Sequence, residues 1–310
     1  MSDETFTLPA HAKINLFLCV LGRRADGYHE IRTLFQTVTL HDRLTFGPSP
    51  DDRIQLECDA PGVPSDERNL VRRAAEALRE RYGVRGGARV LLEKTIPAGG
   101  GLGGGSSDAA AALVGLSHLW GLETGARELS EIGARLGADV PFFLTGGTAL
   151  GTGTGTDVTP VKDLAEHHLV VVTPGVEVST AEAYGALSAP ALTKEGSVAN
   201  LSVSRTEARI YDSLCGMMSN DFERVVYGLH PAIERARDAL LGAGARCAML
   251  SGSGSSVFGV FDTRGEAERA GLALEGEAGW RVFACATLSR AGHLSGFGRC
   301  AAVLRHGRGA

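Results

Sequence analysis

PAGGGLGGGSSDAAAALVGLSHLW, residues 97–120, joins a glycine loop to an alanine-rich segment. Six of the eleven residues from 97 to 107 are glycine, so several backbone amides can approach a bulky anion without interference from a Cβ atom. The preceding run ARVLLEKTI, residues 88–96, predicts a strand. The alanine-rich segment predicts a helix that ends at Gly121, and a helix N-terminus carries about half a positive charge. The order of strand, glycine loop and helix therefore predicts a site for nucleotide phosphates.

The residues around the loop separate it from other glycine loops. A Walker A loop ends in Gly-Lys-Ser/Thr, but Gly105 is followed by two serines. Gly99, Gly101 and Gly104 satisfy the G-x-G-x-x-G spacing of dinucleotide sites, yet another predicted helix follows where that motif requires a strand. The V-A-I-K, H-R-D and D-F-G motifs of protein kinases are absent. A merely flexible turn is disfavoured because each glycine costs up to about 1 kcal/mol in chain entropy.

On both sides of the loop the sequence alternates between strand and helix patterns. Before it, residues 13–21, 31–40 and 53–59 predict strands, and residues 70–82 predict a helix with Asn69 as N-cap and Gly83 at its end. After it, residues 130–136 predict a helix ended by Gly137. The following segment FFLTGGTALGTGTGTD predicts an extended, glycine-rich hairpin.

From His168 onward the pattern changes, and the chain reads as a compact α/β sandwich. Strands are predicted over residues 169–175, 246–252, 257–262 and 281–288, and helices over residues 232–242 and 266–274. The residues after Arg290 show little periodicity and predict a partly disordered tail.

Length, charge and cysteine usage restrict the class of protein. A chain of 310 residues favours two domains. Its net charge of −5 gives no general attraction for nucleic acid or an anionic membrane. The N-terminal residues resemble no secretion signal and no run is long enough to span a membrane, so we expect a cytoplasmic protein. The six cysteines lack a C-x-x-C pair and read as small buried apolar residues, and no metal site is expected.

Three motifs together resemble those of the GHMP kinase family. The loop PAGGGLGGGSSDAA resembles the second motif of that family, and AHAKINLFLCVLGRRADGYHEI, residues 10–31, resembles the first. The third motif is similar to MLSGSGSSVFGVF, residues 249–261. With LGADVPFFL at 136–144 and NDFE at 220–223, the likeness runs in consistent order from about Ala10 to Phe261.

The resemblance implies an α+β fold of two domains with a cleft between them. The N-terminal domain would be ribosomal-S5-like over residues 1–163, and the C-terminal domain ferredoxin-like over 164–290, leaving 291–310 as the tail. It also implies transfer of the γ-phosphoryl group of ATP, with Mg²⁺ on the nucleotide, to the 2-hydroxyl of 4-diphosphocytidyl-2-C-methyl-D-erythritol. The partners would be these two small molecules, and nothing in the sequence specifies an oligomeric state.

The resemblance assigns the catalytic roles to Lys13 and Asp139. Asp139 would act as base toward the hydroxyl, and Lys13 would stabilise the charge that develops. Each residue also has a structural reading: Asp139 as the N-cap of a following turn, and Lys13 as a strand-edge lysine that blocks aggregation.

The resemblance also assigns residues to the two ligands. The nucleotide would bind the glycine loop, that is Pro97, Ala98, Gly99, Gly100, Gly101, Leu102, Gly103, Gly104, Gly105, Ser106 and Ser107. The cytidyl substrate and its phosphates would contact Asn15, Tyr28, His29, Tyr184, Gly252, Ser253 and Gly254. The two serines would equally suit helix capping, and the three residues from 252 to 254 a tight turn.

Two other functions remain open on the sequence. Another kinase of the family would act on mevalonate, homoserine or a sugar, against which the turn at Tyr28 and His29 and the extended glycine loop argue. A catalytically silent nucleotide-binding module is the other alternative, but both Lys13 and Asp139 are present.

Overall fold

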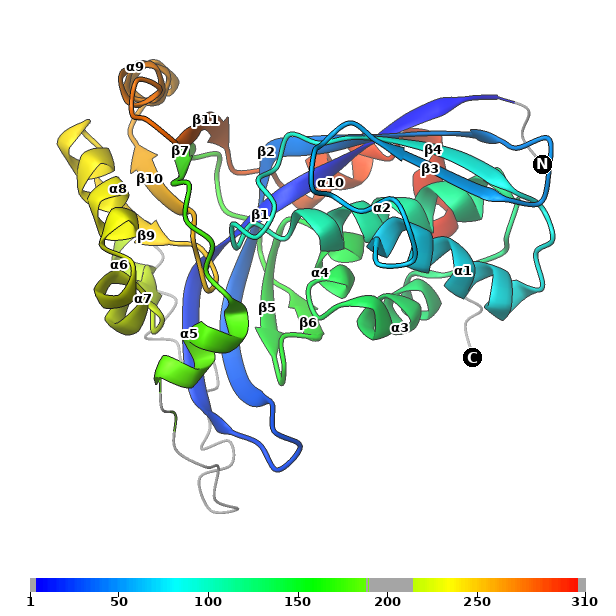
Figure 1. The fold of residues 1–310 in the computed structure, drawn as a ribbon, viewed down its shortest axis with the longest axis horizontal. Helices are drawn as coiled ribbons and strands as arrows, with labels where there is room; N and C mark the ends of the chain where they lie inside the picture. Colours follow the sequence, from blue (N-terminus) through cyan, green and yellow to red (C-terminus); the bar gives the residue numbers. More distant parts are fainter. Residues whose placement is uncertain (1–3, 188, 190–213, 306–310) are drawn as a thin grey trace.

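Two β-sheets organise the chain (Figure 1), and the computed structural model describes residues 4–187, 189 and 214–305. The first sheet has seven strands in the order β3-β4-β2-β1-β8, with β5 paired to β2 and β6 to β5. Its strands are β1 (Phe6–Arg23), β2 (His29–Pro48), β3 (Ile54–Cys58), β4 (Ala88–Glu93), β5 (Thr148–Thr152), β6 (Asp157–Pro160) and β8 (Ser219–Asn220). The second sheet has the order β11-β7-β10-β9, with strands β7 (His168–Thr173), β9 (Cys247–Leu250), β10 (Val257–Phe261) and β11 (Arg281–Ala286).

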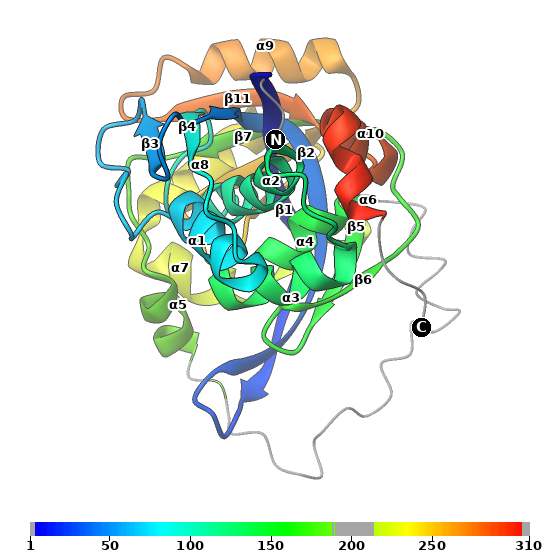
Figure 2. The same ribbon diagram turned by 90° about the vertical axis from the view of Figure 1, so that its right-hand side faces the viewer.

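Helices cover one face of the first sheet. They are α1 (Leu70–Tyr82), α2 (Gly104–Leu119), α3 (Ala126–Leu136) and α4 (Val140–Thr145), which lie together in Figure 2. The predicted bounds of α1 are confirmed: the Asn69 side chain accepts from the amide of Val71, and Gly83 ends the helix at φ 65°. Helix α2 is buried along almost its whole length, which explains its alanine-rich composition.

The second sheet lies between helices and the long β1–β2 pair. On one face Val170 and Val172 pack with α8 (Pro231–Gly242) and α9 (Arg264–Leu274). On the other face Val171 belongs to a core shared with Ile14 of β1. Three shorter helices, α5 (Thr180–Leu187), α6 (Leu214–Met217) and α7 (Glu223–Leu229), complete this half. Strands β1 and β2 thus run through both halves of the molecule, and their side chains can reach a site between them.

Three local expectations are wrong. Helix α3 begins four residues earlier than predicted, and PFFLT is helical in α4, so the hairpin comprises only β5 and β6. Pro141 at the start of α4 suits a helical first turn, which explains the difference. As far as the structure describes it, the tail forms α10 (Arg290–Gly296) and the 3₁₀ segment η2 (Gly298–Leu304), because Phe297 and Val303 are buried in the core of the N-terminal half; residues 306–310 lie outside the described residues.

The expectation for the cysteines is also wrong. Cys215 of α6 and Cys247 of β9 form a disulfide, with Cα atoms 5.7 Å apart. Of the four free cysteines only Cys300 is fully buried. The paired cysteines are 32 positions apart in the sequence, a spacing that gave no signal, because folding alone brings these two elements together.

No helix within the described ranges combines the length and apolar character that crossing a membrane requires.

Candidate active site

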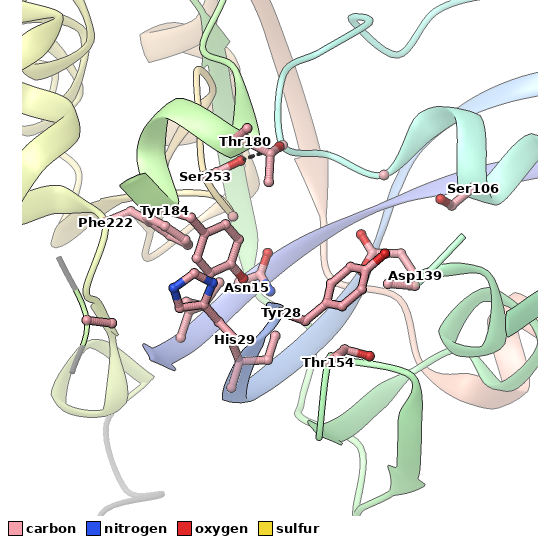
Figure 3. A pocket seen from close by; sticks show the side chains of 18 of the residues that line it. Asn15, Tyr28, His29, Ser106, Asp139, Thr154, Thr180, Tyr184, Phe222 and Ser253 are labelled. Atoms are coloured by element: carbon pink, nitrogen blue, oxygen red, sulfur yellow. Dashed lines mark hydrogen bonds between the residues drawn. The ribbon is translucent and has the colours of Figure 1, made fainter. Parts of the chain in front are cut away.

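A cavity of about 830 Å³ opens where the two halves meet. Its walls come from β1, β2, the glycine loop, the start of α4, the β5–β6 turn, α5 and the turn between β9 and β10 (Figure 3). Segments distant in sequence therefore contribute to one site, as in most ligand pockets between structural units.

Lys13 and Asp139 form an ion pair on the cavity wall. The Lys13 Nζ lies 3.5 Å from the Asp139 Oδ2, and the lysine side chain is 5% exposed against 29% for the aspartate. Asp139 occupies the N-cap position of α4, but its side chain makes no capping hydrogen bond. The carboxylate is thus partly open to the cavity while a buried cation faces it, which differs from both structural readings of these residues.

Asn15 is the second partner of the lysine. Its Oδ1 accepts from Lys13 Nζ at 2.7 Å, and its Nδ2 donates to Thr33 Oγ1 at 2.7 Å. Asn15 is buried and also lines the cavity. The ammonium thus has one hydrogen-bonded partner, Asn15, and one ion-pair partner, Asp139, both at the cavity wall.

The glycine loop packs against the turn between β9 and β10. The amide of Ser256 donates to Gly100 O at 3.0 Å, and Ser251 Oγ donates to Gly101 O at 3.1 Å. A Cβ atom on Gly101 would lie 2.2 Å from Ser251 O. The absence of a side chain therefore permits this contact between the second and third sequence motifs.

The two serines of the loop differ in orientation. Ser106, in the first turn of α2, lines the cavity. Ser107 is buried and donates its hydroxyl to His11 O at 2.6 Å, while its amide donates to Gly103 O. Ser107 thus ties the start of α2 to β1, and its polar groups are used within the protein.

Aromatic rings form the opposite wall of the cavity. The rings of His29 and Tyr184 stack with centroids 4.5 Å apart and an interplanar angle of 20° (Figure 3). Phe222 meets the Tyr184 ring edge-on at 4.8 Å. Tyr28 is 67% exposed and reaches over the cavity.

Burial and nearby charges shift the pKa values of two of these aromatic groups. Burial, with the negative charge of Asp139, raises the pKa of Tyr184 to about 12. Partial burial, with the nearby charge of Arg23, lowers the pKa of His29 below its usual 6.5. Both rings are therefore uncharged at neutral pH and suited to stacking on a planar ligand.

The cavity gathers many, but not all, of the residues expected from the sequence. The expected residues that line it are Lys13, Asn15, Tyr28, His29, Gly101, Gly103, Ser106, Asp139, Tyr184, Gly252 and Ser253. The expected residues that do not are Pro97, Ala98, Gly99, Gly100, Leu102, Gly104, Gly105, Ser107 and Gly254.

Sequence reasoning missed several lining residues, among them Arg23, Thr154, Thr180 and Phe222. Arg23 lies inside the first motif, and Thr154 inside the GTGTGT stretch that reads only as a local repeat. Thr180 pairs with Ser253 through their hydroxyls at 3.1 Å. No pattern in the sequence predicts this contact, because the two residues are 73 positions apart.

In the described part of the chain, no three His, Cys, Asp or Glu side chains are grouped to hold a metal ion.

Comparison with family models matches both halves of the chain. Residues 69–147 match the GHMP kinases N terminal domain, and residues 204–279 match the GHMP kinases C terminal model. Among curated proteins, a 4-diphosphocytidyl-2-C-methyl-D-erythritol kinase of Syntrophotalea carbinolica is 43% identical, over 91% of this chain and 98% of the relative. One of the same name from Bacillus cereus is 41% identical, over 81% of this chain and 86% of its own.

Two solved structures that resemble this chain are also kinases. A crystal structure of 4-(cytidine 5'-diphospho)-2C-methyl-D-erythritol kinase superposes with a TM-score of 0.76 at 37% identity, covering 91% of this chain and 99% of that one. A homoserine kinase from Cytophaga hutchinsonii has a TM-score of 0.66 at 22% identity, covering 93% and 96%. At that identity the second likeness concerns the fold alone.

Proposed function

Because this chain belongs to the GHMP kinase family, we propose that it phosphorylates the 2-hydroxyl of 4-diphosphocytidyl-2-C-methyl-D-erythritol with ATP. The products are the 2-phosphate and ADP, in the non-mevalonate route to isoprenoid precursors. Relatives covering most of the chain carry the name of that kinase. The observation that carries the proposal is the joint presence, in one cavity, of the Lys13–Asp139 pair and the stacked rings of His29 and Tyr184.

Asp139 is the base of the proposed reaction. Its carboxylate takes the proton of the substrate hydroxyl while the hydroxyl oxygen bonds to the γ-phosphorus. The bond between that phosphorus and the oxygen bridging to the β-phosphate breaks, and ADP leaves. Lys13 holds the carboxylate on one side, and its positive charge stabilises the negative charge that develops.

The nucleotide phosphates would lie over the glycine loop at the N-terminus of α2. Gly101, Gly103 and Ser106 line the cavity there, and the first amides of this 16-residue helix lack helical partners. The Ser106 hydroxyl and the Asp139 carboxylate, which both line the cavity, would be the protein oxygens available to hold Mg²⁺ on the bound nucleotide, since this ion prefers oxygen ligands. It would offset the charge of the phosphates during transfer.

The cytosine ring would bind at the aromatic wall. Tyr28, His29 and Tyr184 offer flat aromatic faces for stacking. Arg23 lines the same cavity and gives a cation for the diphosphate that links cytidine to the polyol. This arrangement supports a nucleotide-linked acceptor over a small amino acid or mevalonate.

The test measures ADP release by the purified protein with Mg-ATP and 4-diphosphocytidyl-2-C-methyl-D-erythritol, and the mass of the product. Mevalonate and homoserine serve as control acceptors in parallel. Turnover confined to the cytidyl acceptor, with a gain of one phosphoryl group, is the expected result. Turnover with a control acceptor contradicts the substrate, and no turnover with any acceptor contradicts the proposed activity.

A further inference from the structure

Thr33 of β2 is linked to the proposed catalytic lysine by a chain of short hydrogen bonds. Lys13 donates to Asn15, Asn15 donates to the Thr33 hydroxyl, and that hydroxyl donates to Phe17 O, each bond being 2.7 Å long. Thr33 is fully buried and does not line the cavity, so a direct contact with ligand is excluded for it.

The chain of bonds has one consistent direction. A hydroxyl has a single proton, and that of Thr33 is engaged by the Phe17 carbonyl, so its oxygen can only accept from Asn15. The amide of Asn15 must then present its NH₂ group to Thr33 and its oxygen to Lys13. The lysine ammonium can only donate, so this is the orientation that it requires.

The local backbone makes the arrangement possible. The pairing of β1 with β2 shifts register between Asn15 and Phe17, so that Thr33 stands opposite Leu18. Such a bulge redirects a side chain and leaves a carbonyl outside the regular ladder. The methyl group of Thr33 faces β5, where a Cβ atom on Gly151 would lie 3.0 Å from it.

We propose that Thr33 is a positioning residue that fixes the Asn15 amide, and through it the ammonium of Lys13 against Asp139. Without the hydroxyl, the Asn15 amide loses the partner that selects its orientation. Rotation by half a turn would then bring its NH₂ group against the ammonium, which repels it and displaces the lysine from the carboxylate. The expected effect of Thr33 on turnover rests on the proposed function. Its expected effect on the orientation of the Asn15 amide does not.

The kinetic test is a double-mutant cycle between positions 33 and 15. Thr33→Val keeps the shape of the side chain, and we expect it to lower kcat by about 10-fold to 100-fold with little change in KM for ATP. Thr33→Ser restores the hydroxyl and should stay within about 3-fold of the wild-type kcat. In the Asn15→Ala background, Thr33→Val should have almost no further effect on kcat, since the amide that links position 33 to the lysine is absent.

An equal loss of kcat in both backgrounds, or none in the wild-type background, overturns the proposal. A merely structural role predicts such an equal loss, since it does not depend on Asn15. Thermal melts of each variant set an assay temperature at which all of them are folded.

An NMR measurement on the isotopically labelled protein tests the amide without any substrate. The side-chain NH₂ protons of Asn15 should exchange slowly with solvent in the wild type and in Thr33→Ser, and faster in Thr33→Val. Equally slow exchange in Thr33→Val contradicts the proposal. If the wild-type protein turns over no acceptor, the proposed function fails while this measurement still decides the role of Thr33.

Discussion

At the scale of single residues, the site is made by side chains that the fold constrains closely. Lys13 is almost fully buried, and its ammonium has two partners, Asn15 and Asp139. A buried cation is tolerated only with such partners, because desolvation otherwise costs several kcal/mol. The less buried Asp139 is the member of the pair that a substrate can reach.

Replacing Asp139 with Asn removes the proposed base while keeping the size of the side chain. We expect turnover to fall by about 100-fold or more, since general-base catalysis contributes on that order, and ATP binding and folding to persist. Steady-state kinetics and nucleotide titration measure the two properties. Asp238→Asn, at an exposed position on α8, is the control that should keep its activity. Unchanged turnover in Asp139→Asn excludes its role as the base.

Gly252 has a left-handed backbone at φ +58° in the turn that touches the glycine loop. A Cβ atom there would lie 3.2 Å from Gly101 O and 3.4 Å from Lys13 Nζ. Gly252→Ala should therefore lower kcat as well as the free energy of unfolding, the latter by about 1 kcal/mol or more.

The matched control for this change is Gly298→Ala. Gly298 has a similar φ of +52°, but a Cβ atom there would meet nothing within 4 Å. It should lower the unfolding free energy, measured by urea denaturation, while leaving kcat at the wild-type value. Equal kcat values for the two variants would show that the contact with Lys13 is unimportant.

At the scale of secondary-structure elements, the short strand β8 joins the two walls of the cavity. The buried Asn220 donates from Nδ2 to Leu250 O at 3.0 Å and to Gly252 O at 2.8 Å. Its Oδ1 accepts from the amide of Phe222 at 3.0 Å. One side chain thus fixes both the turn beside the glycine loop and an aromatic residue of the opposite wall.

Asn220→Asp keeps the acceptor for Phe222 but turns an oxygen without a proton toward two carbonyl oxygens. We expect the free energy of unfolding to fall by about 1–3 kcal/mol, the cost of leaving buried polar groups unpaired. The KM values for both substrates should rise together, because both walls of the cavity are displaced. Urea denaturation and initial-rate kinetics measure the effects, and a loss of stability with unchanged KM values would contradict the link between the walls.

At the scale of the whole molecule, the last helices close the N-terminal half through buried histidines. His293 of α10 lies 2.7 Å from Phe143 O, to which its ring nitrogen donates, and its ring lies 5.5 Å from that of His11. Burial, with the charges of His293 and His41, lowers the pKa of His11 to about 3. Burial lowers the pKa of His293 to about 4.

These shifts predict a loss of stability in acid. The unfolded chain takes up protons on both histidines below about pH 6.5, whereas the folded protein keeps them neutral down to pKa values of about 3 and about 4. The free energy of unfolding should therefore fall as the pH drops from 6.5 toward 4, by up to about 1.4 kcal/mol per pH unit for each histidine.

Urea denaturation between pH 5 and pH 7 measures this slope. His293→Gln keeps a donor for Phe143 O but cannot titrate, so its slope should be shallower than that of the wild type. An identical slope in this variant would contradict the assignment of the acid sensitivity to His293.

The features that depend on local backbone preference and on linear motifs could be predicted from the amino-acid sequence. They are the glycine loop in front of α2, the caps of α1 at Asn69 and Gly83, and the strands of both sheets except the short β8. Glycine, capping side chains and β-branched residues act within a few neighbours, so their effects can be read along the chain. The three motifs also indicated the family, because their residues and their order are linear features.

Which side chains meet, by contrast, depended on tertiary packing. Packing turned Ser107 away from the cavity onto β1, paired Cys215 with Cys247, and ordered the tail as α10 and η2. It also placed Thr33 behind Lys13, through a register shift that no sequence pattern marks. Burial and hydrogen-bond partners are set by residues far apart in the chain, and they become defined only when the elements pack.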